Sequence, residues 1–109
     1  MENLEQKLKT LGDANRFKIV KLLLGHDLCV GALAQYLGIS KPAISQHLQV
    51  LRKAGLVKGE KRGYWTHYVV ERDVIKQVAD ALIDMAQQPA HDCSDGYCGL
   101  IQEIKEKPE

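Results

Sequence analysis

The sequence predicts a mainly helical domain that carries one small β-hairpin. Two observations lead to this fold class. Apolar side chains recur at helical spacing in five separate segments of the 109-residue chain, and between the fourth and fifth segments the spacing becomes that of strands. A chain of this length is expected to form one domain with a single layer of core, and such small domains often gain stability by pairing with a second copy.

The two N-terminal helices follow from leucine spacing and from end signals. Residues 4–11 carry leucines at positions i, i+4 and i+7, which predicts a short amphipathic helix that stops near Gly12. A second helix is expected over residues 14–24, because Asp13 is placed to cap its start and Gly25 to end it. The side chains expected to face inward from this helix are Phe17, Val20, Leu23 and Leu24.

A second pair of helices is predicted on either side of a turn at Gly38. The third helix is expected over residues 29–37, with Asp27 near its start and with Val30, Leu33 and Leu37 buried. Ser40 is a good N-cap for the fourth helix, which tolerates Pro42 in its first turn and ends at Gly55. This helix is expected to bury Ile44, Leu48 and Leu51 and to expose Lys41, Ser45, Gln46 and Gln49.

The remaining elements lie beyond Gly55. The segment LVKGEKRGYWTHYVV predicts strands over residues 56–60 and 64–70, joined by a tight turn at KRG in which Gly63 can take positive φ. A fifth helix is expected over residues 73–88, broken by Pro89, with an apolar stripe of Val74, Val78, Leu82 and Met85. The chain is therefore divided into a domain over residues 1–88 and a cysteine-containing tail over residues 89–109.

Positive charge is concentrated between residues 41 and 62, although the formal net charge of the whole chain is only +1. The basic side chains there are opposed by Glu60 alone, which favours a polyanionic partner for this face. The third and fourth helices, their turn and the basic hairpin together make a winged helix-turn-helix. A polar fourth helix of this kind fits the major groove of double-stranded DNA, and basic side chains of the wing reach phosphates or the minor groove.

Several function classes are excluded by what the sequence lacks. No Ser, His and acid set accompanies a glycine elbow and no glycine-rich phosphate loop occurs, so neither an enzyme nor an organic cofactor is expected. No apolar run approaches the ~20 residues that cross a bilayer, and the N-terminus lacks the apolar stretch of a signal peptide. A cytoplasmic protein without membrane contact is expected, and its three cysteines do not predict a disulfide framework.

A family resemblance is carried by two stretches and the helix that follows them. The stretches are LGDANRFKIVKLLL and LCVGALAQYLGISKPAISQHLQVLRKAGLVKGEKRGYWTHYVV. Over about residues 4–88 the chain resembles the ArsR/SmtB family of metal- and metalloid-responsive winged-helix repressors. The run SKPAISQHLQVLRKAGLV followed by GYWTHYVV is fairly specific to that family. The resemblance implies a homodimer that is joined through the first and fifth helices and blocks a promoter until an inducer binds.

The same resemblance implies which residues contact operator DNA. The fourth helix would enter the major groove, and the hairpin would be the wing. Arg52 belongs to the same basic stretch and completes the set of candidates. His47 has a second interpretation, because a histidine beside Leu48 can be packed and hydrogen-bonded within the motif. The candidates are Ser40, Lys41, Pro42, Ser45, Gln46, His47, Arg52, Lys61 and Arg62.

The inducer site is less clear from the resemblance. Many members open the third helix with ELCVCDL, whose two cysteines help to bind arsenite or soft divalent metals. The matching stretch here is DLCVGAL, so Cys29 is kept and Gly31 replaces the second thiol. Cys29 is then either a ligand or a small buried apolar residue. Other members bind metal between paired fifth helices, but no histidine ligand follows within this one.

The other two cysteines lie in the tail segment HDCSDGYCG, where a third arrangement of the family gathers its thiols. Cys93 and Cys98 can converge on one ion, because SDG turns the chain between them. Thiolates are soft ligands, so arsenite is the first choice of inducer, followed by Cu(I), Cd(II) and Zn(II). Arsenite needs a third sulfur, which Cys29 would supply if the tail folds back. Otherwise a mixed site suited to zinc or cadmium would be completed by His91, Asp92 or Asp95.

Two alternative functions stay open. Cys93 and Cys98 are close enough in sequence to form a disulfide, which would make the chain a thiol-based redox-sensing repressor. A constitutive architectural DNA-binding protein would use the same winged helix and ignore the tail. Replacement of both tail cysteines separates a sensor from an architectural protein.

Overall fold

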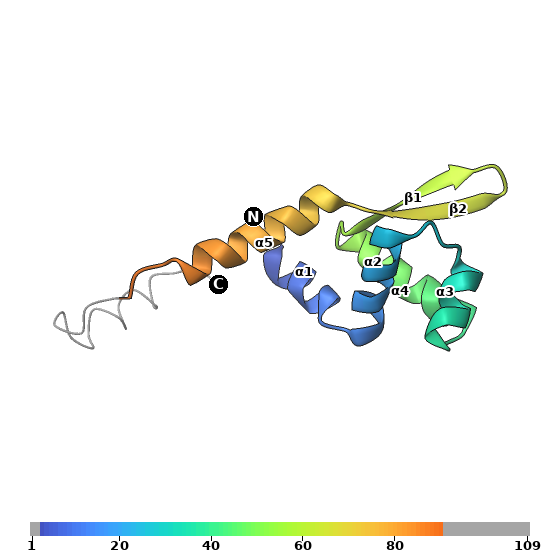
Figure 1. The fold of residues 1–109 in the computed structure, drawn as a ribbon, viewed down its shortest axis with the longest axis horizontal. Helices are drawn as coiled ribbons and strands as arrows, with labels where there is room; N and C mark the ends of the chain where they lie inside the picture. Colours follow the sequence, from blue (N-terminus) through green and yellow to red (C-terminus); the bar gives the residue numbers. More distant parts are fainter. Residues whose placement is uncertain (1–2, 91–109) are drawn as a thin grey trace.

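The computed structural model describes residues 3–90 and confirms the predicted order of helices and strands. Within these residues the chain forms five helices and one antiparallel hairpin (Figure 1). The elements are α1 (Leu4–Leu11), α2 (Ala14–Gly25), α3 (Val30–Leu37), α4 (Lys41–Lys53), β1 (Val57–Arg62), β2 (Trp65–Val70) and α5 (Arg72–Ala86). Residues 91–109 of the predicted tail lie outside the described part, so the domain boundary at residue 88 stays a prediction.

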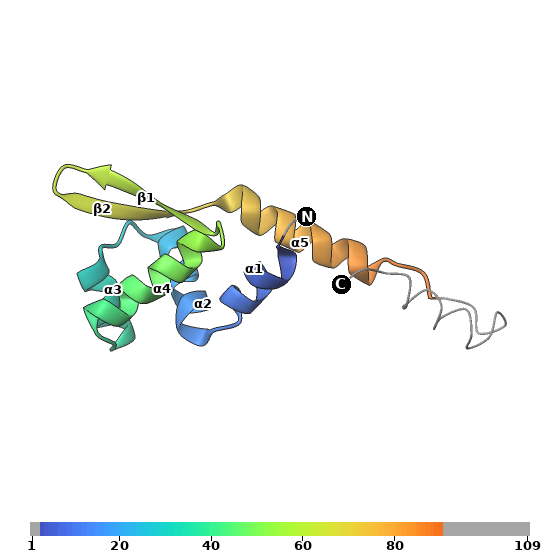
Figure 2. The ribbon, with the colours of Figure 1, turned by 180° about the vertical axis from the view of Figure 1, so that it is seen from behind.

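Helices α2, α3 and α4 form the body of the domain, and the hairpin runs along one side of it (Figures 1 and 2). Helix α1 packs against both α2 and α5. The C-terminal half of α5 extends away from the other described elements (Figure 1). None of the helices in residues 3–90 is long and apolar enough to cross a membrane.

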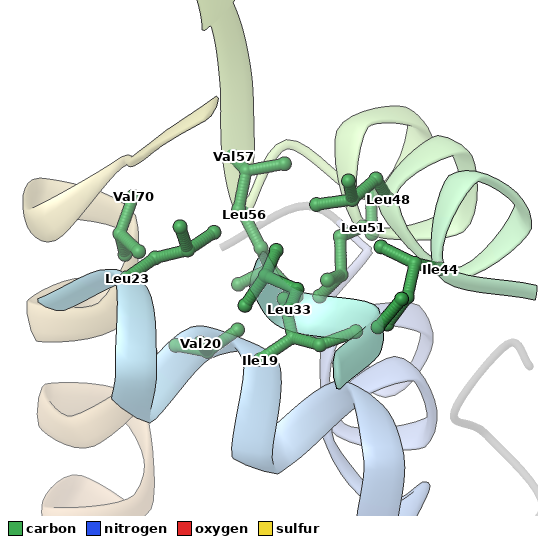
Figure 3. Close-up of a cluster of buried hydrophobic side chains, with 12 residues drawn as sticks. Ile19, Val20, Leu23, Leu33, Ile44, Leu48, Leu51, Leu56, Val57 and Val70 are labelled. Atoms are coloured by element: carbon green, nitrogen blue, oxygen red, sulfur yellow. The ribbon is translucent and has the colours of Figure 1, made fainter. Parts of the chain in front are cut away.

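The core sits where α2, α3 and α4 meet the base of the hairpin (Figure 3). Leu33 of α3 and Ile44 of α4 are fully buried against Ile19 of α2. Burying an aliphatic side chain of this size stabilises a fold by about 1.5–3 kcal/mol, so this seam fixes how α3 and α4 lie relative to α2. The remaining labelled members of the cluster are Val20, Leu23, Leu48, Leu51, Leu56, Val57 and Val70.

Two side chains cap the starts of helices α2 and α4 as predicted, and a glycine ends α3. Asp13 Oδ1 accepts a hydrogen bond from Arg16 N at 3.0 Å, and Ser40 Oγ accepts one from Ala43 N at 3.2 Å. Gly38 ends α3 with a φ of 69°, a left-handed conformation that glycine adopts without steric cost.

The start of α3 differs from the prediction. The helix begins at Val30, and Cys29 is its N-cap, with Sγ accepting a hydrogen bond from Ala32 N at 3.4 Å. Asp27 does not cap this helix. Its carboxylate bonds instead to the hairpin, which lies beside it in space but far from it in sequence.

The hairpin turn lies further along the chain than predicted. Strand β1 runs to Arg62 and β2 begins at Trp65, instead of the predicted ranges 56–60 and 64–70. Lys61 and Arg62 therefore pair with Thr66 and Trp65, respectively, and do not form the turn. Gly63 opens the two-residue loop that remains, with a φ of 65°. Two-residue loops that begin with such a glycine match the twist of antiparallel strands, which explains the longer pairing.

Phe17 is a further correction, because its side chain is 49% exposed instead of facing inward. The buried side of α2 is formed by Ile19, Val20 and Leu23. The ammonium of Lys21 is 5.8 Å from the centroid of the ring. The i, i+3 spacing with Val20 was therefore insufficient to place Phe17 in the core.

The predicted apolar stripe of α5 is buried only near its start. Val78 is 5% exposed, whereas Leu82 and Met85 are 41% and 60% exposed. The helix also ends at Ala86, before the predicted limit at residue 88. The stripe loses its cover because no other described element extends along the C-terminal half of α5 (Figure 1).

We predict that Asp13→Ala lowers the melting temperature at neutral pH. The pKa of Asp13 lies below its ordinary value of 3.8, mainly because the carboxylate accepts the backbone hydrogen bond of Arg16. A lowered pKa in the folded state stabilises the fold above the unfolded pKa, and this contribution disappears as pH falls through the folded value. The gap in melting temperature between wild type and variant should therefore be constant near neutrality and close below pH 3.8.

Thermal unfolding followed by circular dichroism measures this gap. Asp13→Asn is the matched control, since asparagine also caps helices but does not titrate. A gap between wild type and Asp13→Ala that stays unchanged down to about pH 2.5 would contradict the cap as its cause.

Candidate nucleic-acid interface

The surface formed by the start of α4 is polar and exposed. Lys41, Pro42, Ser45 and Gln46 all lie on it, as does the cap residue Ser40. Ile44 and Leu48 are fully buried on the opposite side of the same helix. The apolar contacts thus hold α4 against the body with its polar side facing outward.

The charges of α4 favour an anion at its N-terminus. No acidic residue occurs in its first turn, and Lys41 adds a positive side chain there. A helix N-terminus carries a partial positive charge and backbone N–H groups that attract phosphate. Arg52 is exposed in the last turn of α4, about three turns from that end.

His47 is half-buried and lies in a contact with Arg16, in accordance with the packed interpretation of this residue. Arg16 Nη1 is 3.5 Å from His47 Nδ1, and Arg16 Nε donates to the carbonyl of Thr10 at 2.8 Å. A guanidinium only donates hydrogen bonds, so Nδ1 of the imidazole is the acceptor in this contact. Arg16 therefore joins the end of α1 to α4.

The wing is tied to the loop between α2 and α3 through Asp27. Asp27 Oδ2 accepts from Arg62 Nη1 at 2.9 Å, and its Oδ1 lies 2.8 Å from His67 Nδ1. Arg62 Nη2 also donates to Glu60 Oε1 at 3.1 Å. The pKa of Asp27 is lowered, mainly by the hydrogen bond from His67. The pKa of Arg62 is raised, mainly by its hydrogen bond to Glu60 and next by the negative charge of Asp27.

The rest of the wing is exposed. Lys61 faces solvent on β1, in accordance with a side chain that is available to phosphate. Two aromatic residues, Tyr64 and Trp65, are exposed at the end of the hairpin. Lys58 lies nearer the base, 3.8 Å from Glu71 at the start of α5.

Cys29 is exposed, so it is not the small buried apolar residue of the second interpretation. A Cβ atom on Gly31 would lie 3.9 Å from Cys29 Sγ and 3.5 Å from Lys41 Cε. The position of the missing second thiol is thus next to the first. Within residues 3–90 no three His, Cys, Asp or Glu side chains are grouped to hold a metal ion.

Comparison with known proteins decides the family of this winged helix. Residues 13–58 match the family described as bacterial regulatory protein, arsR family. An uncharacterised HTH-type transcriptional regulator of Methanocaldococcus jannaschii is 37% identical over 71% of this chain and 88% of its own length. The chain belongs to the arsR family.

Three further proteins match this chain in part of its sequence or in most of its fold. The arsenical resistance operon repressor of Escherichia coli is 48% identical over 58% of this chain, which spans 55% of that repressor. The ArsR-like transcriptional regulator from Rhodococcus sp. RHA1 is 27% identical, with a TM-score of 0.71 over 96% of this chain and 94% of its own. A homodimeric winged helix-turn-helix DNA-binding domain from Mycobacterium bovis is 26% identical, with a TM-score of 0.63 over 82% and 85% of the two chains.

As a member of the arsR family, the chain is a DNA-binding transcriptional regulator. The structure brings five of the α4 candidates onto one exposed surface: Ser40, Lys41, Pro42, Ser45 and Gln46. His47 is half-buried against Arg16, Arg52 is exposed in the last turn of α4, and Lys61 and Arg62 lie on the wing. The tail candidates Cys93, Cys98, His91, Asp92 and Asp95 lie outside the described residues.

Sequence reasoning missed three residues that organise this surface. Arg16 joins α1 to α4, and Asp27 with His67 fixes the wing to the body. Each pair is far apart in sequence: 31 residues separate Arg16 from His47, and 40 separate Asp27 from His67. Arg16 and Asp27 are visible in the sequence as charged residues beside predicted helix starts, but no spacing rule names their partners.

We predict that Arg16→Lys lowers the free energy of unfolding by about 1 kcal/mol, the typical net contribution of one hydrogen bond. Lysine keeps the charge but lacks the planar group that reaches Thr10 and His47 together. Urea unfolding measures the change. Lys18→Ala on the exposed side of α2 is the control and should leave stability unchanged. Equal stability of wild type and Arg16→Lys would show that the contact is not stabilising.

Proposed function

We propose that this chain is a homodimeric transcriptional repressor that leaves its operator when cysteine thiolates bind a soft metal or metalloid. The observation that carries the DNA-binding part is the polar surface of α4, held outward by the buried Ile44 and Leu48. A helix exposed in this way can enter the major groove, where side chains distinguish base pairs.

The residues proposed to contact DNA fall into two groups. Gln46 and Ser45 on α4 would reach base edges, whereas Lys41, near the positive end of α4, would bind phosphate. Lys61 would contact phosphate or the minor groove from the wing. The proposed set is Ser40, Lys41, Pro42, Ser45, Gln46, His47, Arg52, Lys61 and Arg62.

A dimer through α1 and α5 is supported by the apolar residues left uncovered on α5. Leu82, Ile83 and Met85 are all exposed on its C-terminal half, within reach of a second copy. The homodimeric domain from Mycobacterium bovis shares this fold, which supports the same state here. Burial of these side chains between two subunits would remove apolar surface from water, the main driving force of association.

The inducer would be a thiophilic species, with arsenite as first choice and Cu(I), Cd(II) or Zn(II) as the other candidates. Cys29 supplies an exposed thiol at the start of α3, and thiolates favour these species. One sulfur is insufficient for arsenite, so Cys93 and Cys98 would supply the others. The name of the Escherichia coli relative, an arsenical resistance operon repressor, supports this choice.

Side-chain replacements on α4 should separate base contacts from phosphate contacts. Gln46→Ala should weaken binding to the preferred sequence by about 1–3 kcal/mol and relax the preference at one base pair. Lys41→Ala should weaken binding to all sequences alike and reduce the slope of log K against log salt by about 1. Fluorescence anisotropy with a duplex selected from a random library measures both effects.

Lys76→Ala is the matched control, because Lys76 is exposed on α5 away from the α4 surface. Its binding constant and salt slope should equal those of the wild type. If Lys76→Ala and Lys41→Ala change the slope equally, the contact surface is not the one proposed.

The double replacement Cys93→Ser and Cys98→Ser should abolish release from DNA by arsenite or Cd(II). We expect the reduced wild-type protein to develop thiolate-to-metal absorption as the duplex is released, because binding of the two ligands is antagonistic. Cys29→Ser should weaken the arsenite response more than the Zn(II) response, since arsenite needs a third sulfur.

The outcome separates the alternatives. Release by a mild oxidant, with no response of the reduced protein to any thiophilic ion, would establish the disulfide switch and overturn the proposed inducer. Unchanged DNA binding under both treatments would identify a constitutive architectural protein.

A further inference from the structure

The outer part of the hairpin is joined to the rest of the domain by one carboxylate. Val57 and Val70, at the base, are buried in the core, but from residue 58 outward β1 is exposed or only half-buried. Within the described residues, the side-chain hydrogen bonds and ion pairs from residues 60–67 to the body of the domain end on Asp27.

We propose that Asp27 is the positioning residue of the wing: by holding Arg62 and His67 together, it sets the direction in which the hairpin meets DNA. The inference rests on the DNA-binding role proposed above. Asp27 itself does not contact DNA in this proposal. Arg62 has two roles, because it fixes the position of the wing and also offers a positive charge to DNA.

The bonds of Asp27 reach both strands of the hairpin. Arg62 is the last residue of β1, whereas His67 lies in the middle of β2 and opposite Glu60. A two-stranded hairpin is marginal in water, and one attached at its base alone can bend and twist. Two bonds of 2.9 and 2.8 Å from one carboxylate to different strands restrict both motions. The wing is thereby ordered before DNA arrives, which lowers the entropy lost on binding.

The geometry leaves Arg62 able to contact phosphate while it is held. Its guanidinium carries five N–H donors, of which the bonds to Asp27 and Glu60 use one on each terminal nitrogen. The side chain is 49% exposed, so the remaining donors are open to an approaching anion. The two carboxylates therefore orient Arg62 without withdrawing it from the surface.

The opposite effect would follow if Asp27 merely competed with DNA for Arg62. Removal of the carboxylate would then strengthen binding, since a repulsive charge near phosphate is lost and a cation is released. The two cases thus differ in the sign of the change, which makes the role of Asp27 measurable.

The test compares Asp27→Asn in the full chain with wild type on a duplex that the wild-type protein has selected from a random library. We expect binding to weaken about three- to tenfold, the range for the loss of a contact that preorganises an element. Hydroxyl-radical footprinting should show reduced protection at the outer flanks, where the wings lie, and unchanged protection where α4 enters the major groove. Asp73→Asn is the control, because it removes one exposed carboxylate from α5 and should leave both readouts unchanged.

A double-mutant cycle identifies the partner. Arg62→Lys keeps a charge for phosphate but cannot bridge two carboxylates as the planar guanidinium does. Its effect and that of Asp27→Asn should therefore be less than additive when combined. Equal or tighter binding by Asp27→Asn, uniform loss of protection across the footprint, or additive effects would each overturn the inference. Failure of the wild-type protein to bind any selected duplex would instead refute the proposed function.

Discussion

The seam between α2, α3 and α4 determines the rest of the structure. Leu33 and Ile44 are fully buried against Ile19, and Leu48 continues the contact one turn further along α4. Because one side of α4 is buried in this packing, the residues on its other side are free to contact a partner and are not needed for the fold. The outward direction of Lys41 and Gln46 is therefore a consequence of apolar burial on the opposite face, and a change in the seam would alter every proposed contact of α4 with DNA.

Electrostatic contacts fix two elements that apolar packing holds less firmly to this seam, namely α1 and the wing. Arg16 joins the end of α1 to α4, and Asp27 joins the wing to the loop before α3. Both contacts are made by charged groups near the surface, where water and salt weaken them. These contacts orient the elements more than they stabilise the fold, since each fixes one element relative to another that is distant in sequence.

Sequence patterns were sufficient for the elements whose causes are local. Asp13 and Ser40 cap the helices that were expected to follow them, because an N-cap acts within three residues of its own position. The turn of the hairpin was placed too early, because the pairing of Lys61 with Thr66 depends on the opposite strand. Phe17 was wrongly placed in the core for a similar reason: spacing shows that a face is apolar but not whether another element covers it. The α4 surface could be predicted from its polar pattern, whereas the Asp27 contact could not, since a carboxylate in a loop carries no local sign of its partner.

The short loop between α2 and α3 contacts two elements of the DNA-binding motif. Asp27 bonds to the wing, and Cys29, two residues later, caps α3 with its sulfur. Residues 26–29 therefore contribute to both elements that flank α4. Leu28, which lies between these two residues, packs partly against the core. The wing and the first helix of the helix-turn-helix are thus both held by side chains of one four-residue segment.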